Sequence, residues 1–224
     1  MKFEAVLFDC DGVLVDSEPI TNGVLRDMLQ ERGWHLTVAE CMRLFVGKTV
    51  RDEADLIEQR TGTTVTEDWL TLFRERRNDA LGRFLTAIPD IHDAVHRVHA
   101  FHGGRIACAS GADRFKVELM LRKLDLFGYF DGRIFSGYET PRSKPFPDVY
   151  LAAAAALGAD PRQCAVVEDT VVGVTAGVAA GATVFAYSPS TSAHVDASAL
   201  RLAGAHHIFT RMTELPDLLN LGNV

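Results

Sequence analysis

Two carboxylates stand two residues apart at the end of an apolar run near the start of the chain. Asp9 and Asp11 follow Ala5–Phe8 and come just before Gly12. Four consecutive apolar residues are typical of a strand buried on both faces, and ligands bind parallel sheets beyond the carboxyl ends of such strands. The pair therefore indicates a metal ion or a phosphoryl group, although an Asp-x-Asp-Gly string alone is equally compatible with an ordinary turn.

Polar residues also follow two later apolar runs, where predicted strands end. Ser110-Gly111 comes after one of them and Glu168-Asp169 after another. Because parallel strands present their carboxyl ends at one edge of a sheet, we expect both groups to lie beside Asp9. Lys144 precedes a predicted helix and can point to the same edge. An ordinary turn does not predict this coincidence.

The secondary structure predicted to position these residues differs between the first third of the chain and the rest. Residues 17–82 show helical periodicity and form a helical insert that finishes near Gly82. Beyond Pro89, predicted strands at 106–109, 134–135, 165–167 and 183–187 alternate with helices. This alternation implies an α/β fold with a parallel sheet and right-handed crossovers.

One predicted helix carries glycines at a spacing of four: Gly173, Gly177 and Gly181. The spacing fits neither a dinucleotide-binding nor a P-loop motif. We interpret these glycines as sites where the helix packs closely on the sheet.

Composition narrows the class of protein. The 224 residues are 47% hydrophobic and 24% charged, with a net charge of −7 and no long basic cluster, so we expect no nucleic-acid partner. No apolar run approaches a membrane span, and the first strand begins without a leader, which predicts a cytoplasmic protein with no membrane partner. The scattered cysteines, with no CxxC pair, are interpreted as reduced and structural: Cys10, Cys41, Cys108 and Cys164.

The order of the motifs resembles the haloacid dehalogenase-like hydrolase superfamily. The matching strings are Phe8-Asp9-Cys10-Asp11-Gly12, Ser110-Gly111, Lys144-Pro145 with Pro147, and Val167-Glu168-Asp169-Thr170. Asp16-Ser17-Glu18 and Phe135-Ser136-Gly137-Tyr138 resemble its β-phosphoglucomutase-like and sugar-phosphate phosphatase branch. The resemblance implies a doubly wound parallel sheet in a Rossmann-like core domain, residues 1–16 and 83–224, with a small helical cap domain at residues 17–82.

The resemblance also implies a mechanism for hydrolysing a small phosphorylated metabolite. Asp9 would attack phosphorus and form an aspartyl phosphate, and Asp11 would act as general acid and then general base. Four clustered carboxylates need positive charge, which Mg²⁺ and Lys144 would supply. The expected metal ligands are Asp9, the backbone carbonyl of Asp11 and Asp169, with Glu168 nearby or joined through water.

Substrate contacts are expected from both domains. The Ser110 hydroxyl and the Gly111 N–H would donate to phosphate oxygens, helped by the N-terminus of the following helix. In the cap, which would close over the site, the candidates for binding an anionic leaving group are Gly47, Lys48, Arg51 and Arg77. Solvated surface charge is an equally good interpretation of the three cap cations. We expect a monomer or weak homodimer.

Four other functions are alternatives to a phosphatase. A phosphoglucomutase-type phosphotransferase is the main alternative, but Thr21 stands where that branch has a cap histidine, and Arg51 is displaced from its arginine position. A dehalogenase needs neither Mg²⁺ nor Asp11, and a phosphonatase would need Lys48 as a Schiff-base lysine. A non-enzymatic phosphoacceptor module would be about half this length and without a helical insert.

Overall fold

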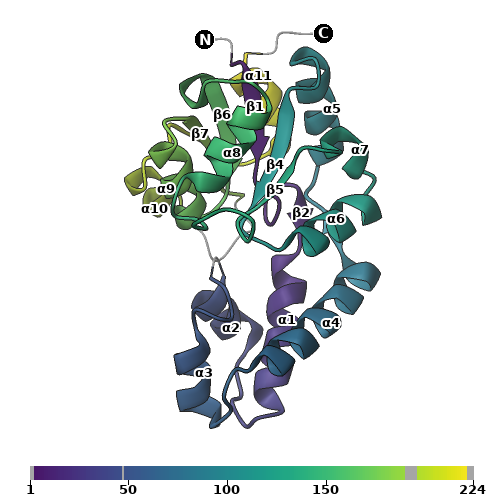
Figure 1. Ribbon diagram of the computed structural model, residues 1–224, viewed down its shortest axis with the longest axis vertical. Coiled ribbons are helices and arrows are strands. Elements are labelled where there is room, and N and C mark those ends of the chain that lie inside the picture. Colours follow the sequence, from purple (N-terminus) through teal and green to yellow (C-terminus); the bar gives the residue numbers. More distant parts are fainter. Residues whose placement is uncertain (1–2, 47, 190–195, 221–224) are drawn as a thin grey trace. The chain divides into compact units, whose positions relative to one another are not determined.

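The computed structural model describes residues 3–46, 48–189 and 196–220 (Figure 1). The chain forms two compact units, one comprising residues 1–15 and 87–224 and the other residues 16–86. It passes between them at strands β2 (Val15–Asp16) and β3 (Thr86–Ala87), which pair as a two-stranded sheet.

The larger unit contains a six-stranded sheet within the described residues. Its strands are β1 (Ala5–Phe8), β4 (Ile106–Ser110), β5 (Ile134–Ser136), β6 (Cys164–Glu168), β7 (Thr183–Tyr187) and β8 (His207–Phe209). The spatial order is β5-β4-β1-β6-β7-β8, and each neighbouring pair is parallel. The predicted α/β fold with a parallel sheet is therefore confirmed.

The strand order reverses at β1. From β1 the chain builds β4 and β5 on one side and then returns to place β6, β7 and β8 on the other. Phe8, the last residue of β1, pairs with Cys108 of β4 and Val167 of β6. A reversal of this kind opens a crevice beyond the strand ends, so Asp9 leaves the sheet where ligands bind in such folds.

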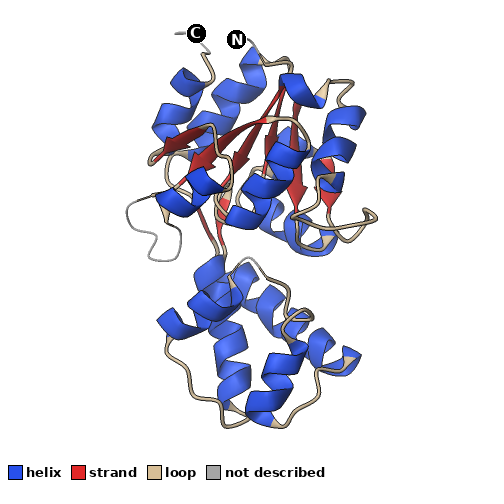
Figure 2. Ribbon diagram, turned by 90° about the vertical axis from the view of Figure 1, so that its left-hand side faces the viewer, coloured by secondary structure: helices blue, strands red, loops and turns tan. Residues whose placement is uncertain are grey.

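Helices cover both faces of this sheet (Figure 2). They are α5 (Ile91–Phe101), α6 (Arg114–Lys123), α7 (Phe127–Phe130), α8 (Asp148–Ala156), α9 (Val171–Ala179), α10 (Ala197–Leu202) and α11 (Leu215–Leu218). Two 3₁₀ turns are η1 (Pro161–Gln163) and η2 (Met212–Glu214). Helices on both faces explain why β1, β4 and β6 are buried along their whole length.

Successive residues of β1 point into opposite halves of the core. Leu7 belongs to a cluster with residues of α8, α9 and α10, including Tyr150 and Val174. Phe8 points the other way, and its ring centroid lies 6.0 Å from that of Phe130 on α7. A Cβ atom on Gly177 would lie 2.9 Å from the side chain of Val184, so the predicted close packing of this glycine on the sheet is confirmed.

The smaller unit is built from α1 (Glu18–Gln30), α2 (Val38–Phe45), α3 (Ala54–Thr61) and α4 (Glu67–Phe84). Threonine side chains cap two of these helices: Thr37 forms a capping box with Glu40, and Thr66 accepts from the N–H of Trp69. The buried core comprises Leu25, Met28, Leu29, Cys41, Phe45, Ile57, Trp69, Leu70 and Phe73. The last helix ends at Phe84, two residues beyond the predicted end at Gly82.

The structure bears on two expectations drawn from the composition, one about membrane spans and one about the cysteines. Among the described residues, none of the helices combines the length and apolarity needed to cross a bilayer. The four cysteines are buried and free of disulfide bonds, as expected for thiols that act as small apolar residues.

Candidate active site

Asp9 stands at the first position beyond β1 and is held there by the sheet. Its N–H donates to the carbonyl of Val167 at 2.9 Å, so the side chain is fixed beside the end of β6. The chain then turns at once, because the N–H groups of Leu14 and Val15 both donate to the carbonyl of Cys10. Gly12, inside this turn, has φ of +79°, which suits glycine.

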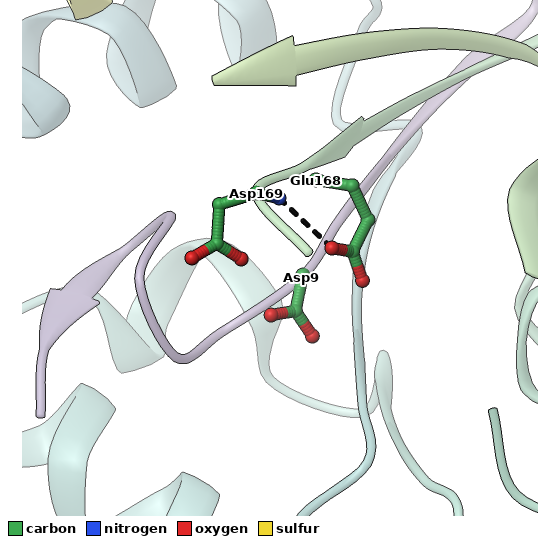
Figure 3. A group of neighbouring side chains, drawn as sticks. All are labelled: Asp9, Glu168 and Asp169. Atoms are coloured by element: carbon green, nitrogen blue, oxygen red, sulfur yellow. Dashed lines mark hydrogen bonds between the residues drawn. The ribbon is translucent and has the colours of Figure 1, made fainter. Parts of the chain in front are cut away.

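Three carboxylates from β1 and β6 gather at this edge of the sheet (Figure 3). One oxygen of each of Asp9, Glu168 and Asp169 lies within 4.8 Å of the others. The three residues are buried, with 6%, 0% and 6% of their surface exposed. Buried carboxylates this close repel one another unless a cation lies between them, so the donor set fits a hard divalent ion such as Mg²⁺.

Lys144 brings a positive charge into this group. Its Nζ donates to Oδ1 of Asp9 at 2.6 Å and to Oε1 of Glu168 at 2.7 Å. Burial opposes the charge on the Lys144 ammonium, but the two carboxylates outweigh burial and raise its pKa well above the usual value. The peptide bond from Lys144 to Pro145 is cis. Lys144 therefore points toward this edge of the sheet, as predicted.

Glu168 is saturated with hydrogen bonds. Besides Lys144, its oxygens accept from the Tyr150 hydroxyl at 3.0 Å, from the N–H groups of Asp169 and Thr170 at 2.8 and 2.9 Å, and from the Thr170 hydroxyl at 3.0 Å. Burial acts to raise the pKa of Glu168, yet Lys144 and the N–H groups of Thr170 and Asp169 lower it below the usual value. Glu168 is thus the ionised partner of Lys144.

Gly173, on α9, makes room for Glu168. A Cβ atom at this position would lie less than 3.0 Å from both carboxylate oxygens of Glu168. Glu168 is the last residue of β6, so the predicted close approach of Gly173 to the sheet is confirmed, while the site side chain that fills its space was not predicted. The signal in the sequence was its place five residues after the glutamate.

Asp9 accepts fewer hydrogen bonds than Glu168, and its pKa shifts in the opposite direction. Burial raises the pKa of Asp9 to about 7, against the lowering effect of Lys144. Glu168 and Asp11 add to the rise through their negative charges. An ionised Asp9 near neutral pH therefore needs more positive charge than Lys144 supplies, and a bound divalent cation would provide it.

Ser110 and Gly111 lie at the end of β4, next to β1. The Ser110 side chain is buried, and its oxygen accepts from the N–H of Ala112 at 3.0 Å. The Ser136 hydroxyl donates to the carbonyl of Ala112 at 2.6 Å, which fixes the loop against β5. Helix α6 begins at Arg114 with Asp113 as its N-cap, close to the predicted start. Serine, glycine and helix N-terminus therefore follow one another at this edge, as an anion site requires.

Asp11 has a partner that the sequence did not indicate. The Nζ of Lys116, in the first turn of α6, lies 2.6 Å from Oδ1 of Asp11. The two residues are 105 positions apart. The only local signal was a lysine in the helix that follows Ser110-Gly111, a position also typical of a surface lysine.

Cys10, between the two aspartates, has a thiol that is held in its protonated form. A hydrogen bond with Cys108 and burial raise the pKa of the Cys10 thiol well above its usual value. The neighbouring carboxylates act in the same direction, as expected from the sequence, but they are the smaller causes.

Three of the candidate cap residues contact other residues of the smaller unit. Lys48 pairs with Glu53 at 2.9 Å, and Arg51 pairs with Glu67 at the surface. Arg77 on α4 is only 7% exposed, donates to Oδ1 of Asn78 at 2.9 and 3.1 Å, and lies over the ring of Phe73. A solvated surface charge is therefore a wrong interpretation of Arg77. Gly47 lies outside the described residues.

Comparison with known proteins identifies the class. A family profile described as haloacid dehalogenase-like hydrolase matches residues 3–181, so the chain belongs to this family. The predicted family, its Rossmann-like fold and the enzyme class of hydrolase are confirmed.

Individual relatives cover nearly the whole chain. A 6-phosphogluconate phosphatase of Escherichia coli K12 is 29% identical over 219 residues, which is 97% of this chain and 95% of the relative. A fructose-1-phosphate phosphatase of the same organism is 29% identical over 80% of this chain and 94% of its own. A HAD family hydrolase of Deinococcus radiodurans R1, whose crystal structure holds phosphate and sodium, is 35% identical with a TM-score of 0.80, covering 98% of this chain and 96% of its own.

Proposed function

We propose that this chain is a Mg²⁺-dependent phosphatase that hydrolyses a sugar phosphate or sugar-acid phosphate through an aspartyl-phosphate intermediate. The observation that carries the proposal is the ammonium of Lys144, 2.6 Å from Asp9 and 2.7 Å from Glu168, beside the buried carboxylate of Asp169. An acidic cluster that is only partly neutralised is suited to a divalent cation and a phosphoryl group together.

The residues proposed to hold the metal are Asp9, Asp169 and the backbone carbonyl of Asp11. Both oxygens of Glu168 already accept protein hydrogen bonds, which suits a position near the metal, joined through water. When bound, Mg²⁺ would neutralise carboxylate and phosphoryl charge, and would so keep Asp9 ionised at neutral pH.

In the first half of the proposed reaction, an oxygen of Asp9 attacks phosphorus while the bond from phosphorus to the sugar oxygen breaks. Asp11 gives its proton to the departing oxygen. In the second half, Asp11 removes a proton from water as the water oxygen bonds to phosphorus, and the electron pair of the breaking bond returns to Asp9. Ser110 and the N–H of Gly111 donate to the non-bridging oxygens, and Lys144 balances charge beside Asp9.

The named relatives support the substrate class. Two of them are a 6-phosphogluconate phosphatase and a fructose-1-phosphate phosphatase, and both names describe phosphomonoesters of sugars or sugar acids. For the leaving group we propose Gly47, Lys48, Arg51 and Arg77 as binding residues. Arg77→Ala should then raise KM for an acidic sugar phosphate far more than for p-nitrophenyl phosphate; equal effects would count against Arg77.

Three features favour hydrolysis over the alternatives. Thr21 replaces the histidine that a mutase of this branch uses, which removes protection of the aspartyl phosphate from water. Asp11 and the pair Glu168-Asp169 have no role in dehalogenation.

We further propose that the protein acts in the cytoplasm as a monomer or weak homodimer, without nucleic acid or membrane.

A screen of phosphorylated metabolites with Mg²⁺ tests the proposal, with released phosphate as the readout. We expect sugar phosphates and sugar-acid phosphates at the top and many turnovers per enzyme. Asp9→Asn should abolish release, while Asp131→Asn, a change of an exposed aspartate, should leave it unchanged. A profile dominated by nucleotides, or a single stoichiometric phosphorylation, would contradict the proposal.

A further inference from the structure

Lys116 reaches the proposed acid and base of the reaction from a neighbouring element. Its Nζ lies 2.6 Å from Oδ1 of Asp11, with side-chain exposures of 8% for the lysine and 15% for the aspartate. Ion pairs at a protein surface contribute little because both side chains are solvated and mobile. This pair is largely withdrawn from water, so it holds the Asp11 carboxylate in a defined orientation.

The helix that carries Lys116 is itself fixed at its first turn. Asp113 caps α6 and accepts from the N–H of Lys116 at 2.9 Å. Arg114 donates to the carbonyl of Ile134 at 2.8 Å and pairs with Glu139 at 2.5 Å, which ties the turn to β5 and the segment after it. The ammonium of Lys116 is therefore presented to Asp11 from a rigid base rather than from a mobile loop.

The two lysines of the site divide the carboxylates between them. Lys144 contacts Asp9 and Glu168, whereas Lys116 contacts Asp11. Asp9 is required for bond formation to phosphorus, but Asp11 must deliver a proton in one half of the reaction and remove one in the other. Because Asp11 has to donate a proton and then accept one at the same place, its efficiency depends on the orientation of its carboxyl group as well as on its basicity.

We propose that Lys116 is a positioning residue that acts through Asp11, an inference that rests on the proposed phosphatase function. By binding Oδ1, Lys116 fixes the orientation of the Asp11 carboxyl group that transfers the proton. In the first half-reaction that proton goes from Asp11 to the sugar oxygen as its bond to phosphorus breaks. In the second half-reaction Asp11 takes a proton from the attacking water. Lys116 exchanges no proton and does not touch the substrate.

The experiment compares two leaving groups in the first turnover. Lys116→Met keeps the length of the side chain and removes the ammonium. With 6-phosphogluconate, whose alkoxide must be protonated as it leaves, we expect leaving-group release to slow by about tenfold to a hundredfold with KM nearly unchanged. With p-nitrophenyl phosphate, whose phenolate leaves without a proton, the first-turnover burst should slow by less than about threefold, and the later steady state should slow because water still needs Asp11.

Matched variants separate positioning from a structural effect. Lys116→Arg should restore most of the rate with 6-phosphogluconate, and Lys123→Met, a change of an exposed lysine on the same helix, should behave as wild type. In the Asp11→Asn background, Lys116→Met should cause no further loss. Thermal unfolding of each variant identifies any that is not folded, and Lys116→Arg then supplies the comparison.

Three results would overturn the inference: equal slowing of both leaving groups in the first turnover, a rise in KM without a fall in kcat, or a further loss in the Asp11→Asn background. Any of these, with an active wild-type enzyme, contradicts the role of Lys116 alone. Failure of the wild-type chain to release phosphate from either compound would overturn the phosphatase function, and the inference with it.

Discussion

The space that a side chain at Gly12 would occupy is filled by the carboxylate of Asp169. A Cβ atom built on Gly12 would lie less than 3.0 Å from Oδ2 of Asp169, closer than Cβ atoms approach other groups in real structures. Gly12 comes from the turn after β1 and Asp169 from the end of β6, so this contact sets how closely the two halves of the site approach.

Gly12→Ala should therefore displace Asp169 as well as strain the turn. We expect kcat to fall by more than about a hundredfold and stability by roughly 1–2 kcal/mol, because alanine at a positive φ is itself unfavourable. Gly33→Ala is the matched control, since Gly33 has φ of +84° with nothing within 4 Å. Similar effects on activity and Mg²⁺ affinity in both variants would contradict a specific role for the Gly12–Asp169 contact.

Gly173→Ala should push Glu168 away from Lys144 and Tyr150. The added methyl group would overlap both carboxylate oxygens, and a shifted Glu168 loses buried hydrogen bonds worth about 1–3 kcal/mol. Chemical denaturation measures this loss. Gly23→Ala, a helical glycine with open space, should be neutral or stabilising by up to about 1 kcal/mol. Stabilisation in both variants would show that Glu168 moves freely.

Lys144→Met should be strongly destabilising, because it leaves the carboxylates of Asp9 and Glu168 buried without their cation. Breaking a buried ion pair on one side costs about 3–5 kcal/mol. Adding Asp9→Asn to Lys144→Met removes one of the unpaired charges and should recover part of the stability without restoring activity. Strictly additive losses in denaturant titrations would mean that Lys144 and Asp9 are not coupled.

Mg²⁺ affinity should depend on pH through Asp9. Burial raises the pKa of Asp9 from 3.8 to about 7, so the metal-free fold favours protonated Asp9. The contribution of Asp9 to stability is then present below pH 3.8 and lost as pH rises through about 7. Since Mg²⁺ binds the ionised carboxylate, proton and metal compete, and the apparent Kd should rise about tenfold for each pH unit below 7 and level off above about pH 8.

Calorimetric titration at several pH values measures this dependence. Asp9→Asn should remove the step near pH 7 and weaken binding at high pH. An apparent Kd in the wild type that stays constant from pH 5.5 to pH 8 would contradict the link between Asp9 protonation and metal binding.

The edge of the sheet that carries the site was predictable from the sequence. An apolar run predicts each strand, and a functional residue lies at or directly after the end of each run. Asp9, Ser110 and Glu168 needed only the rule that parallel strands end at the same side. The helical structure of residues 17–82 was likewise predictable from the spacing of the apolar residues. These predictions use short stretches of chain, where the local pattern determines the structure.

Lys116 and Gly173 could not be assigned in this way. The contact of Lys116 with Asp11 depends on the angle at which α6 leaves β4, and no pattern within the helix encodes that angle. Gly173 has the spacing of a packing glycine, and only the position of the Glu168 side chain reveals its other role. Short elements near the C-terminus, such as β8 and α11, carry too few residues for a periodic signal.

The central claim is that Asp9 becomes covalently phosphorylated during turnover. Borohydride reduction of the enzyme during turnover of 6-phosphogluconate with Mg²⁺ should convert the aspartyl phosphate to homoserine, which peptide mass spectrometry then locates at position 9. We expect this product at Asp9 alone and none when substrate is omitted. An unmodified Asp9 during continued phosphate release, or the product at another aspartate, would contradict covalent catalysis by Asp9.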